Sequence, residues 1–418
     1  MSTKTKNIVE HLFRNEYGKL VAILTRIFGA SHIQLAEDIV QDTLISAMDE
    51  WSKNGVPYNP EGWLMQVAKR KVLNELKRNK MKREHHAILK DHTPDEIGTV
   101  FLEDEIRDSQ LRMIFTCCHP DLNTESQISL ILKTLCGFGV KEVAHALLAT
   151  ESTINKRLYR AKTTIRESNL AFEIPKGKEL EKRLETVLLT MYLLFNEGYN
   201  SSSGNDIIRK DLCLEAVRLT KLLSTHFSDN KKISALLALM CFHIARFDSR
   251  IDNQGGIVLF EDQDRNLWNK EMIGIGMGYL RSSLDDSSLS SYHLEASIAA
   301  EHCMAESFEK TNWNNLKKLY ILLQRFKSNA LIHLNLAIIE SKLKGYEVSL
   351  EMLKMLESEN ELKNYHLLPA TQGIFNMKTG NYKKAIGYLE KALKLKPSAA
   401  EKEFIENKIQ ECRESLLS

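Results

Sequence analysis

Two runs of basic side chains are the groups in this sequence whose types and spacing best fit a defined chemistry, the binding of phosphates and base edges. The run from Lys69 to Arg83 carries eight Lys or Arg residues and one acid. The run from Ile154 to Arg166 carries five basic residues and no acid. Lys and Arg neutralise backbone phosphates, and Arg pairs bidentately with base edges. A charge run is usually a solvated helix face, but such a face normally mixes signs, so we favour nucleic-acid binding.

The second basic run requires two helices joined by a tight turn over 140–167. Apolar residues recur at i, i+3, i+4 and i+7 from Val140, which gives a first helix one buried face. Residues 150–153 supply N-cap side chains for a second helix. Its apolar stripe begins at Ile154, and its basic residues lie on the other side, as in the recognition helix of a helix-turn-helix unit. The candidate DNA-contacting residues are Thr153, Asn155, Lys156, Arg157, Tyr159 and Arg160.

The first basic run is preceded by an acidic helix and a loop. The helix, predicted over 31–51, keeps one face apolar, while acids such as Glu37 and Asp49 make the rest of its surface acidic. Taken alone, it is most simply a solvated amphipathic helix. The Gly, Pro and Asn residues of 52–63 predict a loop, after which the basic helix begins. We expect Trp51 and Trp63 to be core residues.

The composition indicates an all-α protein with a buried core. The chain has 418 residues, of which 43% are hydrophobic and 27% charged, with only 19 Gly and 7 Pro. The net charge is +2, so a nucleic-acid surface must be local. The amino terminus carries no apolar leader, and no apolar run approaches ~18 residues. We therefore expect a cytoplasmic protein without membrane contact.

The cysteines do not form a recognisable framework. There are seven, an odd number, which suggests reduced thiols. Cys117, Cys118 and His119, with Cys136 downstream, are the set that raises the question of zinc. Adjacent cysteines do not easily both face one ion, and no CxxC pair is present. The sequence predicts no metal site and no cofactor.

The residues from Ser152 to Lys162 resemble the recognition helix of region 4 in sigma-70 family transcription factors. The resemblance implies a region 4 helix-turn-helix over 105–172 that reads the promoter −35 element, with its first two helices separated at 119–120. Ser152 stands where glycine is usual in the family, and Asn155 stands where a base is common. Both departures bear on which promoter is read.

The acidic helix and the first basic run resemble region 2 of the same family. Residues 36–51 resemble the surface that docks on core RNA polymerase, with Asp38, Gln41 and Asp42 at the matching positions. Region 2 would span 1–83, followed by an acidic linker over 84–104. The acids run from Asp91 to Asp108, and Pro94 and Gly98 are predicted to act as helix breakers. The residues implied to capture and open the −10 element are Lys53, Tyr58, Asn59, Lys69, Arg70, Asn74, Lys77 and Arg78.

Residues 173–418 form a long extension after the two regions. The strings FTCCHP and FNEGY, together with the extension, resemble a subgroup of extracytoplasmic function (ECF) sigma factors with a tetratricopeptide-like C-terminal domain. Residues 366–397 match a helical-hairpin repeat, and the turn at 344–346 marks a degenerate copy. Such an array binds a protein or peptide partner or serves as a structural cap. The polar islands 197–200 and 262–268 are more often structural networks than catalytic sites.

The resemblance implies an ECF-type sigma factor with two small helical domains and a helical-repeat domain that regulates activity. Its partners would be core RNA polymerase and promoter DNA. We expect no enzyme, since no nucleophile–base pairing, HExxH motif or phosphate loop is present. The alternative is a helix-turn-helix regulator that binds DNA without polymerase and senses a ligand or protein through its C-terminal domain.

Overall fold

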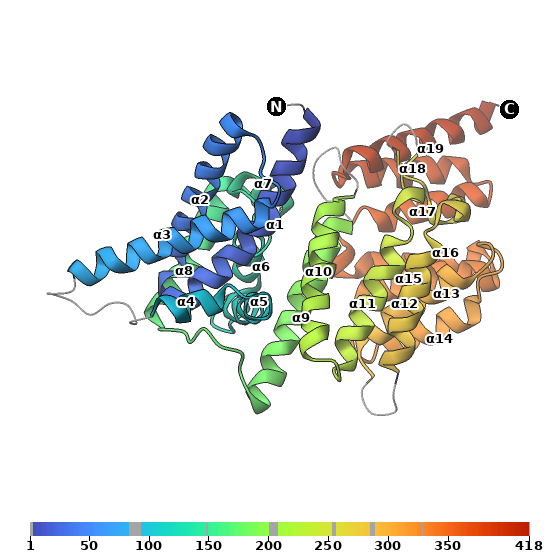
Figure 1. Cartoon of the computed structure of the whole chain (residues 1–418). Coiled ribbons are helices and arrows are strands. Elements are labelled where there is room, and N and C mark those ends of the chain that lie inside the picture. Colours follow the sequence, from blue (N-terminus) through green and yellow to red (C-terminus); the bar gives the residue numbers. More distant parts are fainter. Residues whose placement is uncertain are drawn as a thin grey trace. The chain divides into compact units, whose positions relative to one another are not determined.

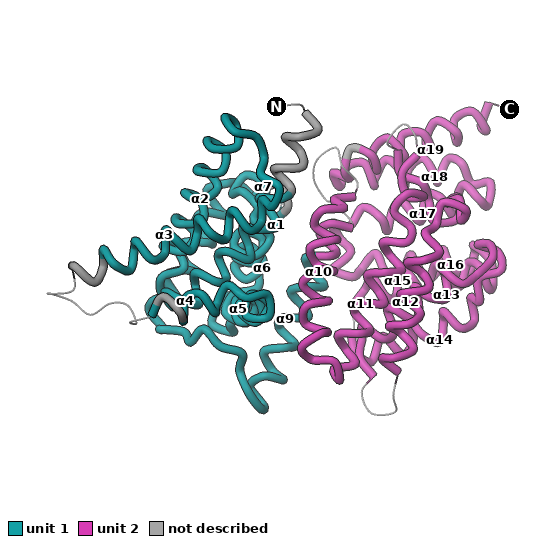
Figure 2. Tube along the Cα trace, viewed as in Figure 1, with its two compact units in different colours: residues 1–194 teal, residues 195–418 magenta. Residues whose placement is uncertain are grey.

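The structure is a computed structural model that describes residues 3–82, 93–147, 149–199, 208–252, 256–284, 289–327 and 329–417. Within these ranges it consists of the α-helices α1 to α19 and short 3-10 helices, without a β-strand (Figure 1). The predicted all-α fold is confirmed. The chain divides into two compact units, which we call unit 1 (residues 1–194) and unit 2 (residues 195–418) (Figure 2).

Unit 1 contains the helices that surround both basic runs. Their bounds are α1 Thr3–Phe28, α2 Ile33–Asn54, α3 Pro60–Lys82, α4 Pro94–Val100, α5 Glu103–Cys117, α6 Thr124–Thr134, α7 Val140–Ala146, α8 Glu151–Glu167 and α9 Gly177–Tyr199. The predicted break at 119–120 falls between α5 and α6, and the predicted tight turn falls between α7 and α8. The two predicted sigma regions therefore lie in one compact unit.

Helix α1 is the centre of the unit 1 core. Leu20, Val21 and Leu24 are fully buried, and α1 packs against α2, α3, α5 and α6. Gly18 lies against the backbone of Leu135, the residue that follows α6. A Cβ atom on residue 18 would lie 1.9 Å from the Leu135 carbonyl oxygen. The close approach of α1 to the end of α6 therefore requires glycine.

Substituting Gly18 by alanine is expected to lower the free energy of unfolding by ~3 kcal/mol, because the two backbones must move apart. Gly387→Ala is a matched control, since that helical glycine has nothing within 4 Å of its Cβ position. The control should raise stability by ~0.5–1 kcal/mol through helix propensity. Denaturant unfolding of both variants measures the difference. A Gly18→Ala protein at least as stable as the parent would contradict the contact.

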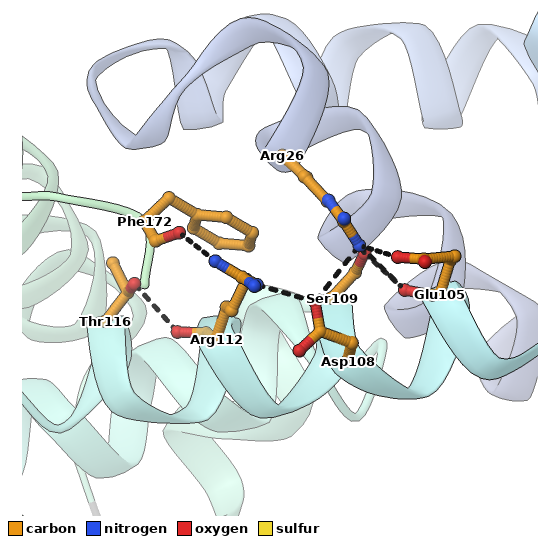
Figure 3. Close-up of polar contacts among 7 residues, drawn as sticks. All are labelled: Arg26, Glu105, Asp108, Ser109, Arg112, Thr116 and Phe172. Atoms are coloured by element: carbon orange, nitrogen blue, oxygen red, sulfur yellow. Dashed lines mark hydrogen bonds and ion pairs between the residues drawn. The ribbon is translucent and has the colours of Figure 1, made fainter. Parts of the chain in front are cut away.

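Arg26, near the end of α1, joins α1 to α5 (Figure 3). Its guanidinium lies 2.6 Å from the Glu105 carboxylate and 3.1 Å from the Asp108 carboxylate. Asp108 also accepts a hydrogen bond of 2.6 Å from Arg112 Nε, and Arg112 Nη1 donates to the Phe172 carbonyl oxygen at 3.4 Å. Glu105 and Asp108, at the end of the predicted acidic stretch, therefore form ion pairs with neighbouring basic side chains.

The predicted linker contains a helix, so the assignment of Pro94 and Gly98 as helix breakers is wrong. Pro94 is the first residue of α4, where its missing N–H would have no partner in any case. Thr93 and Glu96 form a capping box, with the Glu96 N–H donating to Thr93 Oγ1 at 3.2 Å and the Thr93 N–H to Glu96 Oε2 at 2.8 Å. Residues 83–92 of the predicted linker lie outside the described residues.

Helix α9 extends unit 1 beyond the predicted domain boundary at 172–173. The buried Arg183 guanidinium donates a hydrogen bond of 2.8 Å to the Phe115 carbonyl oxygen on α5. The Thr190 hydroxyl lies 3.4 Å from Gln127 Oε1 on α6. These long-range contacts place the boundary between the compact units after residue 194.

Unit 2 is a series of helices in antiparallel pairs. Their bounds are α10 Lys210–His226, α11 Lys231–Ile244, α12 Lys270–Ser283, α13 Ser291–Met304, α14 Trp313–Leu323, α15 Ala330–Lys344, α16 Tyr346–Met355, α17 Leu367–Lys378, α18 Tyr382–Lys394 and α19 Ala399–Leu417. The predicted repeat corresponds to the pair α17–α18, and the predicted degenerate copy to α15–α16. A Cβ on Gly373 of α17 would lie 2.6 Å from the Leu389 side chain of α18, so these helices meet closely at this glycine.

Candidate nucleic-acid interface

Helix α8 is the predicted recognition helix, and its buried stripe fixes its orientation. Thr150 caps it, because the Thr153 N–H donates a hydrogen bond of 3.1 Å to Thr150 Oγ1. The buried side chains follow the predicted apolar stripe, and they are Ile154, Leu158, Ala161 and Ile165. The helix packs through this stripe on α6 and α7. Its opposite side is left to solvent.

The outward side of α8 carries most of the predicted DNA-contacting residues. Asn155, Lys156 and Arg160 are exposed, and Tyr159 exposes 71% of its surface. Two other predicted residues are engaged within the unit. The Thr153 hydroxyl lies 2.9 Å from Thr150 Oγ1, and Arg157 forms an ion pair with Glu125 on α6. The exposed group, from Asn155 to Arg160, is a cation-bearing surface less than two helix turns long that can contact phosphates and base edges.

Lys162 of α8 joins the predicted region 4 to the predicted region 2. Its ammonium forms an ion pair with Glu37 of α2 and donates a hydrogen bond of 2.8 Å to Gln34 Oε1. Glu37 is 1% exposed, so its predicted place on the acidic solvent face is wrong. Burial and the Glu37 carboxylate together raise the pKa of Tyr17 on α1. The carboxylate therefore lies in the core and takes its counter-ion from a helix far away in sequence.

Helix α2 exposes the three residues predicted to bind polymerase. Asp38, Gln41 and Asp42 are exposed along one side of the helix. Ile45 and Met48, further along α2, expose 56% and 60% of their surfaces. The sequence prediction missed these two apolar residues, although they continue the acidic side at helical spacing. An acidic surface with exposed apolar side chains fits a protein partner that is basic at its rim.

The loop between α2 and α3 presents Tyr58 fully to solvent. The neighbouring Asn59 side chain caps α3, since the Gly62 N–H donates a hydrogen bond of 2.9 Å to its Oδ1. The aromatic pair Trp51 and Trp63, with ring centroids 5.5 Å apart, holds the two ends of the loop. Trp51 is buried, as predicted, and Trp63 is half-buried. A rigid frame therefore carries one free aromatic ring, which suits base stacking.

The basic helix α3 divides its cations between contacts within the unit and solvent. Arg70, Asn74 and Lys77 are exposed at spacings of four and three, so they lie on one side of the helix. Arg78 pairs with Glu75 at 2.7 Å. The other predicted residues are Lys53, which is exposed near the end of α2, and Lys69, which is half-buried. A further lysine, Lys71, donates to the Asp42 carbonyl oxygen at 2.7 Å and so connects α3 to α2.

The three cysteines that raised the question of zinc are core residues, whereas His119 is half-buried. Cys117, Cys118 and Cys136 are buried, and burial raises the pKa of the Cys118 thiol to about 12. Cys117 Sγ lies 3.5 Å from the Thr134 hydroxyl. Over the described ranges, no group of three His, Cys, Asp or Glu side chains has the geometry to hold a metal ion.

The two polar islands of the extension contribute to packing in unit 2. Arg265 donates hydrogen bonds of 2.7 Å to the carbonyl oxygens of His302 and Ala305 at the end of α13, and it stacks 4.4 Å from the Trp268 ring. The Arg250 guanidinium lies over the Tyr199 ring, 3.8 Å from the ring centroid. These contacts are of the kind expected if the polar islands form a structural network rather than a catalytic site. Asn200 lies outside the described residues.

Comparisons with known proteins match two parts of the chain to families and nearly the whole chain to one relative. Residues 12–81 match the sigma-70 region 2 family, and residues 183–284 match a family of unknown function (DUF6596). The chain is also similar to the "Uncharacterized protein R00370" of Rhizobium meliloti (strain 1021), with 31% identity over 378 residues that cover 90% of this chain and 89% of that protein. In the part of the chain that the structure describes, no helix is long and apolar enough to cross a bilayer.

Proposed function

We propose that the chain is an ECF-type sigma factor of the sigma-70 family with a regulatory C-terminal extension, because residues 12–81 match the sigma-70 region 2 family. It would bind core RNA polymerase through α2, capture the −10 element with the loop before α3 and with α3 itself, and read the −35 element with α8. Its work would take place in the cytoplasm, where core polymerase meets the promoter. No covalent chemistry is needed, since binding to opened DNA drives the opening.

One observation carries this proposal. Tyr58 stands fully exposed at the tip of a loop whose ends are held by the Trp51–Trp63 pair, directly before the exposed Arg70, Asn74 and Lys77 of α3. The Trp51–Trp63 pair packs within the unit, whereas the Tyr58 ring has no packing role and is fully available to a ligand. It is useful where an unstacked base must be held while nearby cations neutralise its strand.

The adjacent side of α2 supports polymerase docking. Asp38 and Asp42 supply charge for steering, and Ile45 and Met48 supply apolar area that a partner can bury. A repressor that binds duplex DNA alone needs neither this surface nor a melting segment. The polymerase-independent regulator is therefore the second candidate function, and only the exposed surface of α8 supports it.

Replacing Tyr58 by alanine is expected to reduce strand opening by about tenfold or more, since a base–aromatic stack contributes ~1–3 kcal/mol. Permanganate reactivity of −10 thymines measures opening in the complex of the full chain with core polymerase. The fold should be unaffected, because Tyr58 is fully exposed. Tyr382→Ala on α18, a half-buried tyrosine of unit 2, is the control and should retain opening.

The same preparation distinguishes the two functions. A sigma factor should bind its promoter duplex specifically only with core polymerase, and Asp38→Lys/Asp42→Lys should weaken core binding. Asp104→Lys/Asp121→Lys, at two exposed acids elsewhere in unit 1, is the matched control. Tight sequence-specific duplex binding by the chain alone, unaffected by core polymerase, would replace the sigma proposal with the free-standing regulator.

A further inference from the structure

Unit 2 contains a cavity of about 320 Å³ with a largely aromatic wall. It lies among α13, α14, α15, α17 and the short helix η3 (Phe260–Asp262), and its rings are those of Phe260, Phe308, Trp313, Tyr320 and Phe375. Phe308 packs at 5.0 Å on Trp313 and at 5.8 Å on Phe260, measured between ring centroids. Because these rings support one another, the cavity is preformed rather than a gap that collapses.

Lys342 brings a positive charge to this apolar wall. Its Nζ lies 4.7 Å from the Phe308 ring centroid and 3.1 Å from the Glu261 carboxylate. Glu261 is shared with a second cation, since Lys378 Nζ lies 3.8 Å from its other oxygen. One carboxylate thus faces two ammonium groups, so the local charge at this side of the cavity is positive.

Two arginines next to the cavity add to this positive field. Arg246 stacks on Phe260 at 4.1 Å and donates to Gln263 Oε1, and Arg265 lies 6.0 Å from the same Phe260 ring. Neither arginine forms an ion pair with a carboxylate among the described residues. The exposed Glu309 is another acid that interacts electrostatically with Arg265 and Lys342. Of the charged groups named here, four are cations and two are carboxylates.

A neutral polar atom in the cavity wall is left without a partner. His302 lines the cavity, and its Nδ1 atom is buried with no hydrogen-bond partner within the described part of the chain. Burial, with Arg246 and Arg265, lowers the pKa of His302 to about 3, so the ring is neutral at physiological pH. Asn335 adds an amide to the same wall. Because the Nδ1 atom has almost no accessible surface, a ligand in the cavity would contact the neutral His302 ring rather than this atom.

From these contacts we infer that the cavity is a binding site for a small aromatic carboxylate. The ring system would pack against the aromatic wall, and the carboxylate would reach Lys342 and displace part of its pairing with Glu261. The volume corresponds to about ten water molecules, so a ligand of roughly ten to fifteen non-hydrogen atoms fits. A cationic ligand is disfavoured by the surrounding charge. This inference does not depend on the proposed role in transcription.

Calorimetric titration of the full chain with three probes of one shape tests the inference. The probes are 2-naphthoate, neutral 2-naphthamide and cationic 2-naphthylmethylammonium. The carboxylate is expected to bind about tenfold or more tightly than the ammonium probe, because charged hydrogen bonds and the positive field favour it. Lys342→Met should weaken naphthoate binding by about tenfold and leave naphthamide binding nearly unchanged. Lys318→Met, an exposed lysine on α14 outside the cavity wall, should change neither.

Two further variants keep the test decisive. Glu261→Gln removes the opposing charge and should tighten naphthoate binding about threefold or more, a gain that misfolding cannot mimic. Ile338→Trp fills the cavity and should abolish binding of all three probes while the circular dichroism spectrum stays helical. Equal affinity for the three probes, or naphthoate binding that survives Ile338→Trp, would overturn the inference. Absence of naphthoate binding to the folded parent chain would overturn it as well.

Discussion

Reversing two charges on α8, Lys156→Glu with Arg160→Glu, is expected to reduce promoter-specific transcription by about a hundredfold or more. Both side chains are exposed on the outward side of the helix, so in the proposed complex they lie against the −35 element. Each lost contact costs ~1–3 kcal/mol, and glutamate adds repulsion from the phosphates. Run-off transcription by the full chain with core polymerase measures the loss.

The same double reversal should leave folding intact, because neither side chain takes part in the buried stripe of α8. The matched control is Lys383→Glu with Lys391→Glu, two exposed lysines on α18 of unit 2. The control changes the net charge of the chain equally and should retain most of the transcript. An equal loss in both proteins would assign the effect to overall charge and not to α8.

Removing the ammonium of Lys162 is expected to destabilise unit 1 by ~3–5 kcal/mol, the usual cost of leaving a buried charge without its partner. In Lys162→Met the Glu37 carboxylate, 1% exposed, loses its ion pair between α8 and α2. Lys141→Met, an exposed lysine on α7, should change stability by less than ~0.5 kcal/mol. Denaturant unfolding followed by circular dichroism gives the comparison.

The double variant Glu37→Met with Lys162→Met tests whether the stability lost in Lys162→Met comes from the unpaired charge or from lost packing contacts. Replacing both partners by apolar side chains is often close to neutral, so the double variant should be more stable than Lys162→Met alone. A single variant as stable as the parent would show that the Glu37–Lys162 pair does not form in solution. A double variant no better than the single would point to packing rather than charge.

Local patterns were sufficient to predict the helices that carry the candidate site. The apolar stripe from Ile154 to Ile165 and the cap at Thr150 define α8 because both depend on neighbours within a few residues. The exposed side of α2 followed from the same periodicity. The all-α fold followed from the few glycines and prolines in the sequence.

The errors concern interactions between residues far apart in the chain. Glu37 reads as a surface acid, because nothing near it in sequence reveals that Lys162 pairs with it across 125 positions. The contact between Arg26 and Asp108 joins residues 82 positions apart, so no local pattern in the sequence reveals it either. Pro94 is different, since its signal was local. The sequence Thr93-Pro94-Asp95-Glu96 is a capping box with proline at the first helical position, and it predicts the start of α4.

Run-off transcription from fragmented genomic DNA of the source organism, with bacterial core RNA polymerase and the full chain, tests the sigma proposal most directly. We predict discrete transcript starts that appear only when the chain is added, preceded by shared −35 and −10 elements. Tyr58→Ala should reduce these starts by about tenfold or more, and Lys156→Glu/Arg160→Glu by about a hundredfold or more. An absence of core binding together with no added transcript start would contradict the proposal, and the polymerase-independent regulator would then take its place.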